Sequence, residues 1–268
     1  MINRRHFVNS CAMGLTASLF PVSTQAKTGA SPAYQGKGYH YQKPHFPQGS
    51  RLLFQGDSIT DMNWGRNQSD RNHYLGHSYV FLLAARLGTD MPETGLEFFN
   101  RGKSGNKVSD LKKRWQTDTL EMKPDLLSVL VGTNDVGIGF RNTQKKVTPE
   151  MFERDYRHIL QASRLANPAL RLVLLDPFVL PTGPLLNPQA YQARRKETDR
   201  MRNVVARLAK DFGAAHLRTQ DIFDEAAKRT GPKNWIWDGV HPLPQGHELI
   251  ARHWLDLVST KWPRPVKK

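Results

Sequence analysis

Four short polar segments of this 268-residue chain contain residues that could carry out chemistry. Ser58 lies in the first segment, and a serine hydroxyl becomes a nucleophile when a histidine takes its proton. The last segment contains Asp238 and His241, at a spacing that lets the carboxylate reach the imidazole Nδ1 within one loop. Each of these residues also has an ordinary structural interpretation, as a helix cap, a turn former or a surface histidine. In chain order the segments are Gly56-Asp57-Ser58-Ile59-Thr60-Asp61, Asn100-Arg101-Gly102-Lys103-Ser104-Gly105-Asn106, Gly132-Thr133-Asn134-Asp135 and Trp237-Asp238-Gly239-Val240-His241-Pro242.

Short apolar runs precede the first three polar segments, and helical patterns separate these runs. We predict strands over residues 51–55, 96–100, 126–131, 171–175 and 214–218. Strands that alternate with helices are typical of βαβ units, which build a parallel sheet covered by helices. Such sheets bind their ligands at the carboxyl ends of the strands, which is where the polar segments fall. The predicted fold class is α/β.

Capping residues and apolar faces predict three of the helices. Thr148 and Pro149 suit the cap and the first turn of one helix, and Gly213 ends a second. The last helix is expected over about residues 245–258, with Trp254 facing the sheet.

The four polar segments, in this order, resemble the four sequence blocks of the SGNH (GDSL) hydrolase superfamily, and the resemblance covers about residues 51–258. It implies a three-layer, flavodoxin-like fold in which a five-stranded parallel sheet has helices on both faces. Within the superfamily, the chain is most similar to bacterial carbohydrate acetylesterases such as xylan acetylesterases. The features that carry this narrower similarity are the surroundings of Gly76 to Tyr79, the Ser104-Gly105-Asn106 turn, Arg114-Trp115 and Trp237-Asp238.

The resemblance also implies a role for each residue of the site. Ser58 would attack the ester carbonyl, His241 would carry the proton, and Asp238 would orient the imidazole. The oxyanion hole would consist of the backbone amides of Ser58 and Gly105 and the side chain of Asn134. The implied activity is that of a serine esterase that hydrolyses O-acetyl esters on a polysaccharide.

Aromatic residues near the polar segments are candidates for contacts with sugar rings, although aromatic side chains in such places are equally often core residues. Loops over residues 62–75 and 138–147 are expected to wall the site, whereas Asp57 and Asp135 are expected to hold loops. The candidates for sugar stacking are Trp64, Tyr74, Trp235 and Trp237.

Two further functions fit the same resemblance. One is a lipase-like or thioesterase SGNH hydrolase of small acyl esters, and the other is a carbohydrate-binding protein on the same fold without turnover. The expected ligand is an acetylated polysaccharide or a small acyl ester, and the sequence leaves open whether the protein forms a homo-oligomer.

The first 26 residues are typical of an export signal, with Arg4 and Arg5 before an apolar stretch and Ala26 at the expected cleavage position. The paired arginines also resemble a twin-arginine signal, so two export routes stay open. The only cysteine, Cys11, lies within this segment, so the mature protein would contain no disulfide. We therefore expect a periplasmic or secreted protein with the organisation 1–26 export signal, 27–50 linker or N-terminal arm, 51–260 SGNH hydrolase domain and 261–268 basic tail.

The chain is strongly basic, with 39 lysines and arginines against 24 acidic residues and a formal net charge of +15. This charge favours anionic surfaces, and export makes an acidic polysaccharide or a cell envelope a better partner than nucleic acid, for which no binding motif is present. A solvated basic surface without a specific partner explains the charge equally well. After the export signal, no apolar run approaches the roughly 20 residues of a membrane-spanning helix.

Other catalytic motifs fail on spacing. The run Gly102-Lys103-Ser104 has Glu97 where a phosphate loop needs its first glycine, and the pair His247-Glu248 has Ala251 where a zinc protease needs its second histidine. A dinucleotide fingerprint starting at Gly137 fails at Asn142, and there is no Gly-x-Ser-x-Gly elbow. The sequence therefore predicts no metal and no cofactor.

Ester hydrolysis is accordingly expected to be insensitive to chelators. The measurement is the rate of acetate release before and after dialysis against EDTA. A loss of activity that zinc restores would contradict this prediction and would indicate a site built from dispersed histidines such as His73, His77 and His247.

Overall fold

The computed structural model describes residues 41–264. The expected export signal and residues 27–40 of the expected arm lie outside the described residues, as do residues 265–268. In the part of the chain that is described, no helix is both long and apolar enough to cross a membrane.

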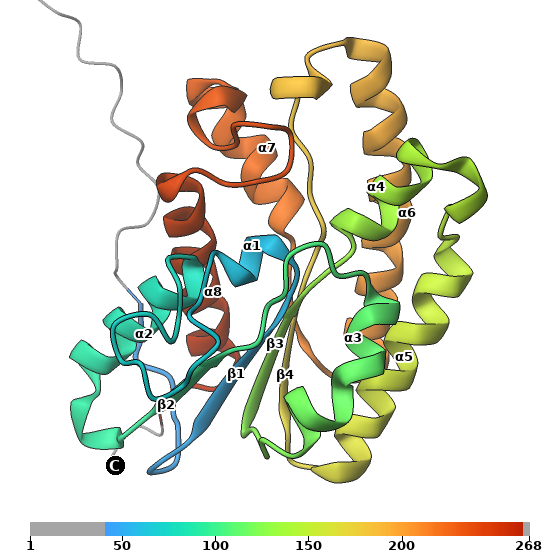
Figure 1. Ribbon diagram of the computed structural model, residues 1–268. Helices are drawn as coiled ribbons and strands as arrows, with labels where there is room; N and C mark the ends of the chain where they lie inside the picture. Colours follow the sequence, from blue (N-terminus) through green and yellow to red (C-terminus); the bar gives the residue numbers. More distant parts are fainter. Residues whose placement is uncertain (1–40, 265–268) are drawn as a thin grey trace, which may run out of the picture. The chain divides into compact units, whose positions relative to one another are not determined.

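The sheet is parallel and has five strands in the order β2-β1-β3-β4-β5 (Figure 1). This result confirms the predicted α/β fold, and each predicted strand agrees with the structure to within one residue at either end. Because β1 pairs with β2 on one side and β3 on the other, the strand order reverses between β1 and β3, and open α/β sheets bind their ligands beyond the carboxyl ends of the strands at such a point. The strands are β1 (Arg51–Gly56), β2 (Glu97–Asn100), β3 (Leu126–Leu130), β4 (Arg171–Leu175) and β5 (Ala215–Leu217).

Helices cover both faces of the sheet (Figure 1). One face is covered by α3 (Val108–Trp115), α5 (Pro149–Ala166) and α6 (Pro188–Asp211), and the other by α2 (Tyr79–Asp90) and α8 (Pro244–Lys261), with α7 (Thr219–Thr230) against α8. Two shorter helices, α1 (Ser58–Asp61) and α4 (Thr133–Arg141), follow β1 and β3. Single turns of 3-10 helix span Pro92–Thr94, Thr143–Lys145, Gly183–Leu185 and Pro232–Asn234, and a π-helical turn spans Gln116–Leu120.

Coverage on both faces explains why the central strands are almost continuously apolar. All five residues of β3 are buried, and the one polar residue among them, Ser128, accepts a hydrogen bond from the Trp254 indole at 3.1 Å. The Trp254 ring also packs on Phe54 of β1, with 5.7 Å between the ring centroids. Trp254 therefore joins α8 to two neighbouring strands through one buried side chain.

The predicted helix signals are confirmed. The Thr148 hydroxyl accepts a hydrogen bond from the Met151 amide at 3.3 Å, as an N-cap does. Gly213 follows α6 with a φ of 61°, a left-handed conformation that glycine adopts without strain. The last helix is longer than predicted at both ends and continues to Lys261.

The described part of the expected arm pairs with the end of the chain. Pro44 and Pro263 form an antiparallel bridge, and the amide of His45 donates to the carbonyl of Trp262 at 2.8 Å. Tyr41 donates to the carboxylate of Asp90 at 2.7 Å. These contacts place residues 41–50 near the amino ends of the strands, away from the polar segments.

The central position of Trp254 leads to a stability prediction. Trp254→Ala should lower the free energy of unfolding by about 3–5 kcal/mol, because it leaves a large cavity and removes the hydrogen bond to Ser128. Leu165→Ala is the matched control, since 87% of the Leu165 surface is exposed, and it should change this free energy by less than about 0.5 kcal/mol. Urea unfolding measures both values, and equal values for the two variants would contradict the prediction.

Candidate active site

The first turn of α1 places Ser58 directly beyond the carboxyl end of β1. The Asp57 carboxylate accepts a hydrogen bond from the Ile59 amide at 3.0 Å and so caps this helix. A Cβ on Gly56 would lie 2.4 Å from both the Leu130 carbonyl oxygen and the Thr60 hydroxyl. Only glycine fits at this turn, and Ser58 after it is half-buried.

A second tight loop carries Asp238 and His241. An antiparallel bridge between Ile236 and Pro242 closes the loop at its base. Within the loop, one oxygen of the Asp238 carboxylate accepts hydrogen bonds from the amides of Val240 and His241 at 3.1 and 2.8 Å. These two backbone amides hold the carboxylate in place independently of its contact with the His241 ring.

Ser58, His241 and Asp238 are connected in series by hydrogen bonds. The Ser58 hydroxyl lies 2.7 Å from His241 Nε2, and His241 Nδ1 lies 2.6 Å from the second oxygen of Asp238. An ionised carboxylate can only accept, so Nδ1 carries the proton and Nε2 presents its lone pair to the hydroxyl. This arrangement suits removal of the Ser58 proton by His241.

The charges of the pair reinforce this arrangement. Hydrogen bonding to Asp238 raises the pKa of His241 above its usual range, against the effect of burial. Burial by itself would raise the pKa of Asp238, but the hydrogen bonds from His241 and Val240 outweigh it and hold this pKa below its usual range. The geometry therefore favours an imidazolium next to an ionised aspartate once His241 has taken a proton.

The residues named for the oxyanion hole come from three segments: Ser58 begins α1, Gly105 lies in the loop after β2, and Asn134 is the second residue of α4. Gly105 has a φ of 81° and is exposed, with no atom within 4 Å of the position that a Cβ would take. The side-chain amide of Asn134 donates one hydrogen to the carbonyl of Asn106 at 3.2 Å. A primary amide has a second hydrogen, which it can donate to a substrate oxygen.

Asp61 holds the loop of Gly105, a role that our sequence analysis did not predict. Its buried carboxylate accepts hydrogen bonds from the Ser104 amide and hydroxyl, both at 2.8 Å, and from Arg66 at 2.7 Å. Burial opposes ionisation of Asp61, but these donors lower its pKa below the usual range. An acidic residue three positions after Ser58 was visible in the sequence, but its partners were not.

The loop after β4 is a second feature that sequence reasoning missed. The Thr182 hydroxyl accepts a hydrogen bond from the Gly239 amide at 2.8 Å, and the Leu180 amide donates to the Gly239 carbonyl at 3.0 Å. Gly183 approaches so closely that a Cβ on it would lie 2.7 Å from Cα of Asp238. The loop after β4 therefore packs against the backbone of Asp238 and Gly239 and holds it in place.

The prediction that Asp57 and Asp135 hold loops is confirmed. Asp57 caps α1, and the Asp135 carboxylate accepts from the Val108 amide at 3.2 Å, at the first residue of α3. Burial raises the pKa of Asp57 to about 6 and that of Asp135 to about 7. Both carboxylates lie beneath the site and face the protein interior.

The four aromatic candidates differ in how much of their ring surface is available. Trp237 is 62% exposed, and its ring lies beside the His241 ring at 6.3 Å between centroids. Trp235 is buried and donates to the Thr230 hydroxyl at 2.9 Å, so its expected role in sugar stacking is wrong for this structure. Trp64 and Tyr74 are half-buried, and their rings already contact arginine side chains. Trp237 is thus the best placed of the four for a sugar ring.

The two expected wall loops have different structures. Residues 62–75 form a loop whose Leu75 carbonyl accepts a hydrogen bond from Asn100, at the end of β2, at 2.8 Å. Residues 138–147 are mostly helical, because α4 continues to Arg141 and a 3-10 turn follows at Thr143–Lys145. The expectation of a loop there was wrong, since the helix that begins beside Asn134 runs on for two further turns.

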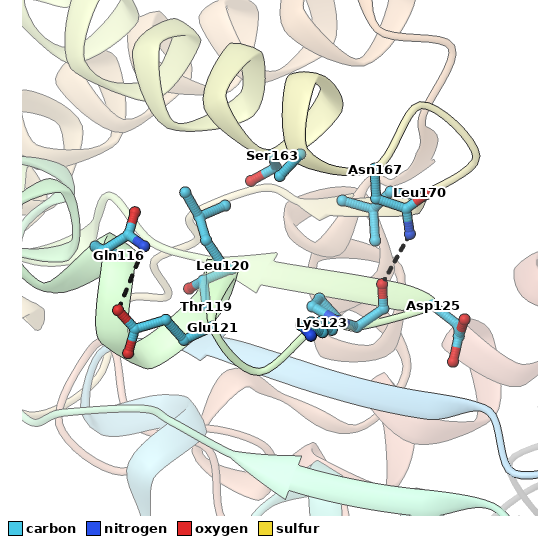
Figure 2. A pocket seen from close by; sticks show the side chains of 11 residues that line it. Gln116, Thr119, Leu120, Glu121, Lys123, Asp125, Ser163, Asn167 and Leu170 are labelled. Carbon is cyan, nitrogen blue, oxygen red and sulfur yellow. Dashed lines mark hydrogen bonds between the residues drawn. The ribbon is translucent and has the colours of Figure 1, made fainter.

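A cavity of about 670 Å³ lies away from these residues (Figure 2). Its lining includes Asp125, which precedes the first residue of β3, and Asn167, whose side chain donates to the Pro124 carbonyl at 3.2 Å. The cavity is therefore at the amino ends of the strands, whereas Ser58 follows the carboxyl end of β1. Within residues 41–264, no three or more His, Cys, Asp or Glu side chains gather in a way that could hold a metal ion.

The chain matches the GDSL-like Lipase/Acylhydrolase family over residues 54–249. It is 33% identical over 222 residues to an acetylxylan esterase from Geobacillus stearothermophilus, and the alignment covers 81% of this chain and 97% of that esterase. A Bacillus subtilis protein described as an uncharacterized lipoprotein is 32% identical over 110 residues, which is 41% of either chain.

Solved structures of GDSL-like enzymes are also similar to this chain. A GDSL-like lipase from Parabacteroides merdae superimposes with a TM-score of 0.75 at 32% identity, covering 81% of this chain and 99% of the other. The Geobacillus acetylxylan esterase superimposes with a TM-score of 0.70 at 32% identity, covering 82% and 99%. Two variants of that esterase, in which alanine replaces an aspartate or a serine, are described as catalytic mutants. The chain belongs to the GDSL-like lipase/acylhydrolase family and is a carboxylic ester hydrolase.

The pair formed by Asp238 and His241 leads to a pH prediction. In Asp238→Asn the negative charge is lost, so the pKa of His241 should fall, and the acidic limb of kcat/KM should move to lower pH. The reason is that only neutral His241 can accept the Ser58 proton. We also expect kcat to fall by about 10⁴-fold, because asparagine no longer selects the required tautomer. The measurement is a pH–rate profile with 4-nitrophenyl acetate.

Asp70→Asn is the matched control for this profile. Asp70 and His73 form a second pair with the same spacing, joined at 2.8 Å, but His73 is exposed and bonds no serine. This variant should retain the profile of the parent enzyme. An Asp238→Asn enzyme with an unshifted acidic limb and full activity would show that His241 does not depend on Asp238.

Proposed function

We propose that this protein is a serine esterase that removes acetyl groups from a polysaccharide through an acyl-enzyme on Ser58. The observation that carries the proposal is the hydrogen-bonded series of Ser58, His241 and Asp238. Gly105 lies on the loop after β2, and Asn134 in the first turn of α4 is hydrogen-bonded to that loop. Each residue type matches one need of ester hydrolysis: a nucleophile, a proton carrier, an orienting carboxylate and neutral donors for a developing negative charge.

The reaction proceeds in two steps at these atoms. His241 Nε2 takes the proton as Ser58 Oγ attacks the carbonyl carbon, and the carbonyl oxygen becomes an oxyanion that the Ser58 and Gly105 amides and the Asn134 side chain stabilise. The C–O bond to the sugar then breaks, and the proton on His241 passes to the leaving alcohol. In the second step His241 activates water, which releases acetate and restores the Ser58 hydroxyl.

The acetyl group and the glycan are supported by separate observations. The acetyl group is supported by the similarity to the Geobacillus acetylxylan esterase over nearly the whole length of that protein. The glycan is supported by the exposed Trp237 ring beside His241, because an open aromatic face suits the apolar side of a sugar ring.

We also propose that the enzyme acts outside the cytoplasm. The proposal rests on the charge and apolar pattern of residues 1–26, with cleavage after Ala26. It agrees with a polymeric substrate, which does not enter the cell. The mature chain would then consist of the linker or arm, the hydrolase domain and the basic tail.

A chain-length series tests the acetyl preference. We expect kcat/KM on 4-nitrophenyl esters to fall by about tenfold from acetyl to butanoyl and further to octanoyl, because added methylene groups need space that an acetyl site does not provide. Acetate should also be released from acetylated xylo-oligosaccharides. A rise in rate from acetyl to octanoyl would instead indicate the lipase-like or thioesterase alternative.

Ser58→Ala is the control for every substrate in this series. Loss of the hydroxyl should abolish turnover and leave the free energy of unfolding nearly unchanged, because the side chain is only half-buried. Binding of a glycan by the parent protein without any Ser58-dependent acetate release would favour a carbohydrate-binding protein on the same fold.

A further inference from the structure

Helix α4 leads from the proposed oxyanion hole to a pair of arginines. Asn134, Gly137 and Arg141 are three and four residues apart along this helix, so they lie on one face. With a rise of 1.5 Å per residue, Arg141 lies about 10 Å along the helix axis from Asn134. The first half of α6 runs beside α4 (Figure 1) and contributes Arg194.

Arg194 is held against α4 in a half-buried position. Its guanidinium donates a hydrogen bond at 2.7 Å to the carbonyl of Thr133, the residue next to Asn134. It also lies 5.4 Å from the centre of the Phe140 ring. Burial, and then the positive charge of Arg141, lower the pKa of Arg194 to about 10.

Gly137 brings the two guanidinium groups together. A Cβ at this position would lie 2.9 and 3.0 Å from the two terminal nitrogens of Arg194 and 3.3 Å from one of Arg141. The two cations therefore converge over one bare stretch of helix backbone. Any larger residue would occupy the space between them.

Neither arginine has an acidic partner within residues 41–264. Arg194 bonds only to a neutral carbonyl oxygen there, and the exposed Arg141 side chain has no hydrogen bond or ion pair. The remaining arginines of α6 differ, because each of them is hydrogen-bonded to at least one carboxylate. They are Arg195, Arg200, Arg202 and Arg207.

Two neighbouring like charges repel, and a half-buried cation without a counterion is costly. An arrangement of this kind is stabilised when an anion binds between the charges. The planar guanidinium fork matches the two oxygens of a carboxylate, which it can bind through paired hydrogen bonds. The position on the Asn134 face of α4 would put this anion beside the reacting ester.

We infer that Arg141 and Arg194 form a subsite for the carboxylate of a uronic acid unit in the glycan that carries the acetyl ester. The inference rests on the proposed function and adds a substrate class to it, namely acetylated acidic glycans. The carboxylate lies over Gly137 and accepts hydrogen bonds from both guanidinium groups. The subsite selects the glycan, whereas Ser58, His241 and Asp238 act on the ester.

The test compares an acidic with a neutral substrate. Arg141→Gln and Arg194→Gln should each lower the ratio of kcat/KM for acetylated oligogalacturonide over acetylated xylo-oligosaccharide by about tenfold, as expected for a lost hydrogen bond to a charged group. The change should appear in KM for the acidic substrate and not in kcat. Arg194→Lys, which keeps the charge but loses the fork, should give an intermediate ratio.

Lys210→Gln is the matched control. It removes the same charge from the same helix, but it lies about 24 Å from Arg194 along the axis of α6. It should leave the ratio unchanged. A fall of equal size in all variants would mean that the basic surface acts as a whole and would overturn the subsite.

Binding without turnover gives a second, independent readout. Isothermal titration with unacetylated trigalacturonate should show binding to the parent enzyme and about tenfold weaker binding to Arg141→Gln. Because the Arg141 side chain is exposed, its replacement does not disturb the fold. Equal affinities would overturn the inference.

If the parent enzyme releases acetate from neither glycan, the proposed function fails, and the titration still decides the subsite. If it releases acetate from both with an unchanged ratio in the arginine variants, the acetylesterase stands and the subsite is wrong.

Discussion

The geometry of the site depends on the contact between the buried carboxylate of Asp61 and Ser104. This carboxylate lies at the end of the helix that Ser58 begins, and it accepts two hydrogen bonds from Ser104, the residue before Gly105. Gly102 permits this contact, because a Cβ on it would lie 2.4 Å from the Asp61 amide nitrogen. The distance between the nucleophile and one proposed oxyanion donor is thereby set by a single buried charge and its donors, and not by the flexibility of two surface loops.

The same principle applies to the rest of the site. The Asp238 backbone is held by the loop after β4 through Thr182, and Asn134 is connected to the Gly105 loop through Asn106. The segments that carry Ser58, Asp238 and Asn134 are therefore each held by a neighbour from another βα unit. A parallel sheet makes such cross-support available, since all of its strand ends meet at one edge.

The net charge of the chain and the local pairing of its arginines describe different properties of this molecule. The net charge of +15 describes the whole chain, but most arginines of α6 are paired with carboxylates and contribute to packing. Arg194 differs from these arginines because it has no carboxylate partner among the described residues. Arg141 has none there either, and it lies on the helix that carries Asn134. Local pairing is thus a better guide to anion recognition than total charge, because a neutralised cation exerts little attraction at a distance.

The sequence by itself determined the fold class, the positions of all strands to within one residue, and the segments that contain Ser58, Asn134, Asp238 and His241. These features depend on local patterns: apolar runs, capping residues and the short spacing between Asp238 and His241. Only the tertiary structure decided that Asp61 bonds Ser104, that Thr182 supports Gly239, that Trp235 is buried while Trp237 is open, and that Arg141 meets Arg194 over Gly137. These contacts join residues whose proximity is set by helix packing and by the paths of loops, and no spacing within a short segment of the chain encodes them.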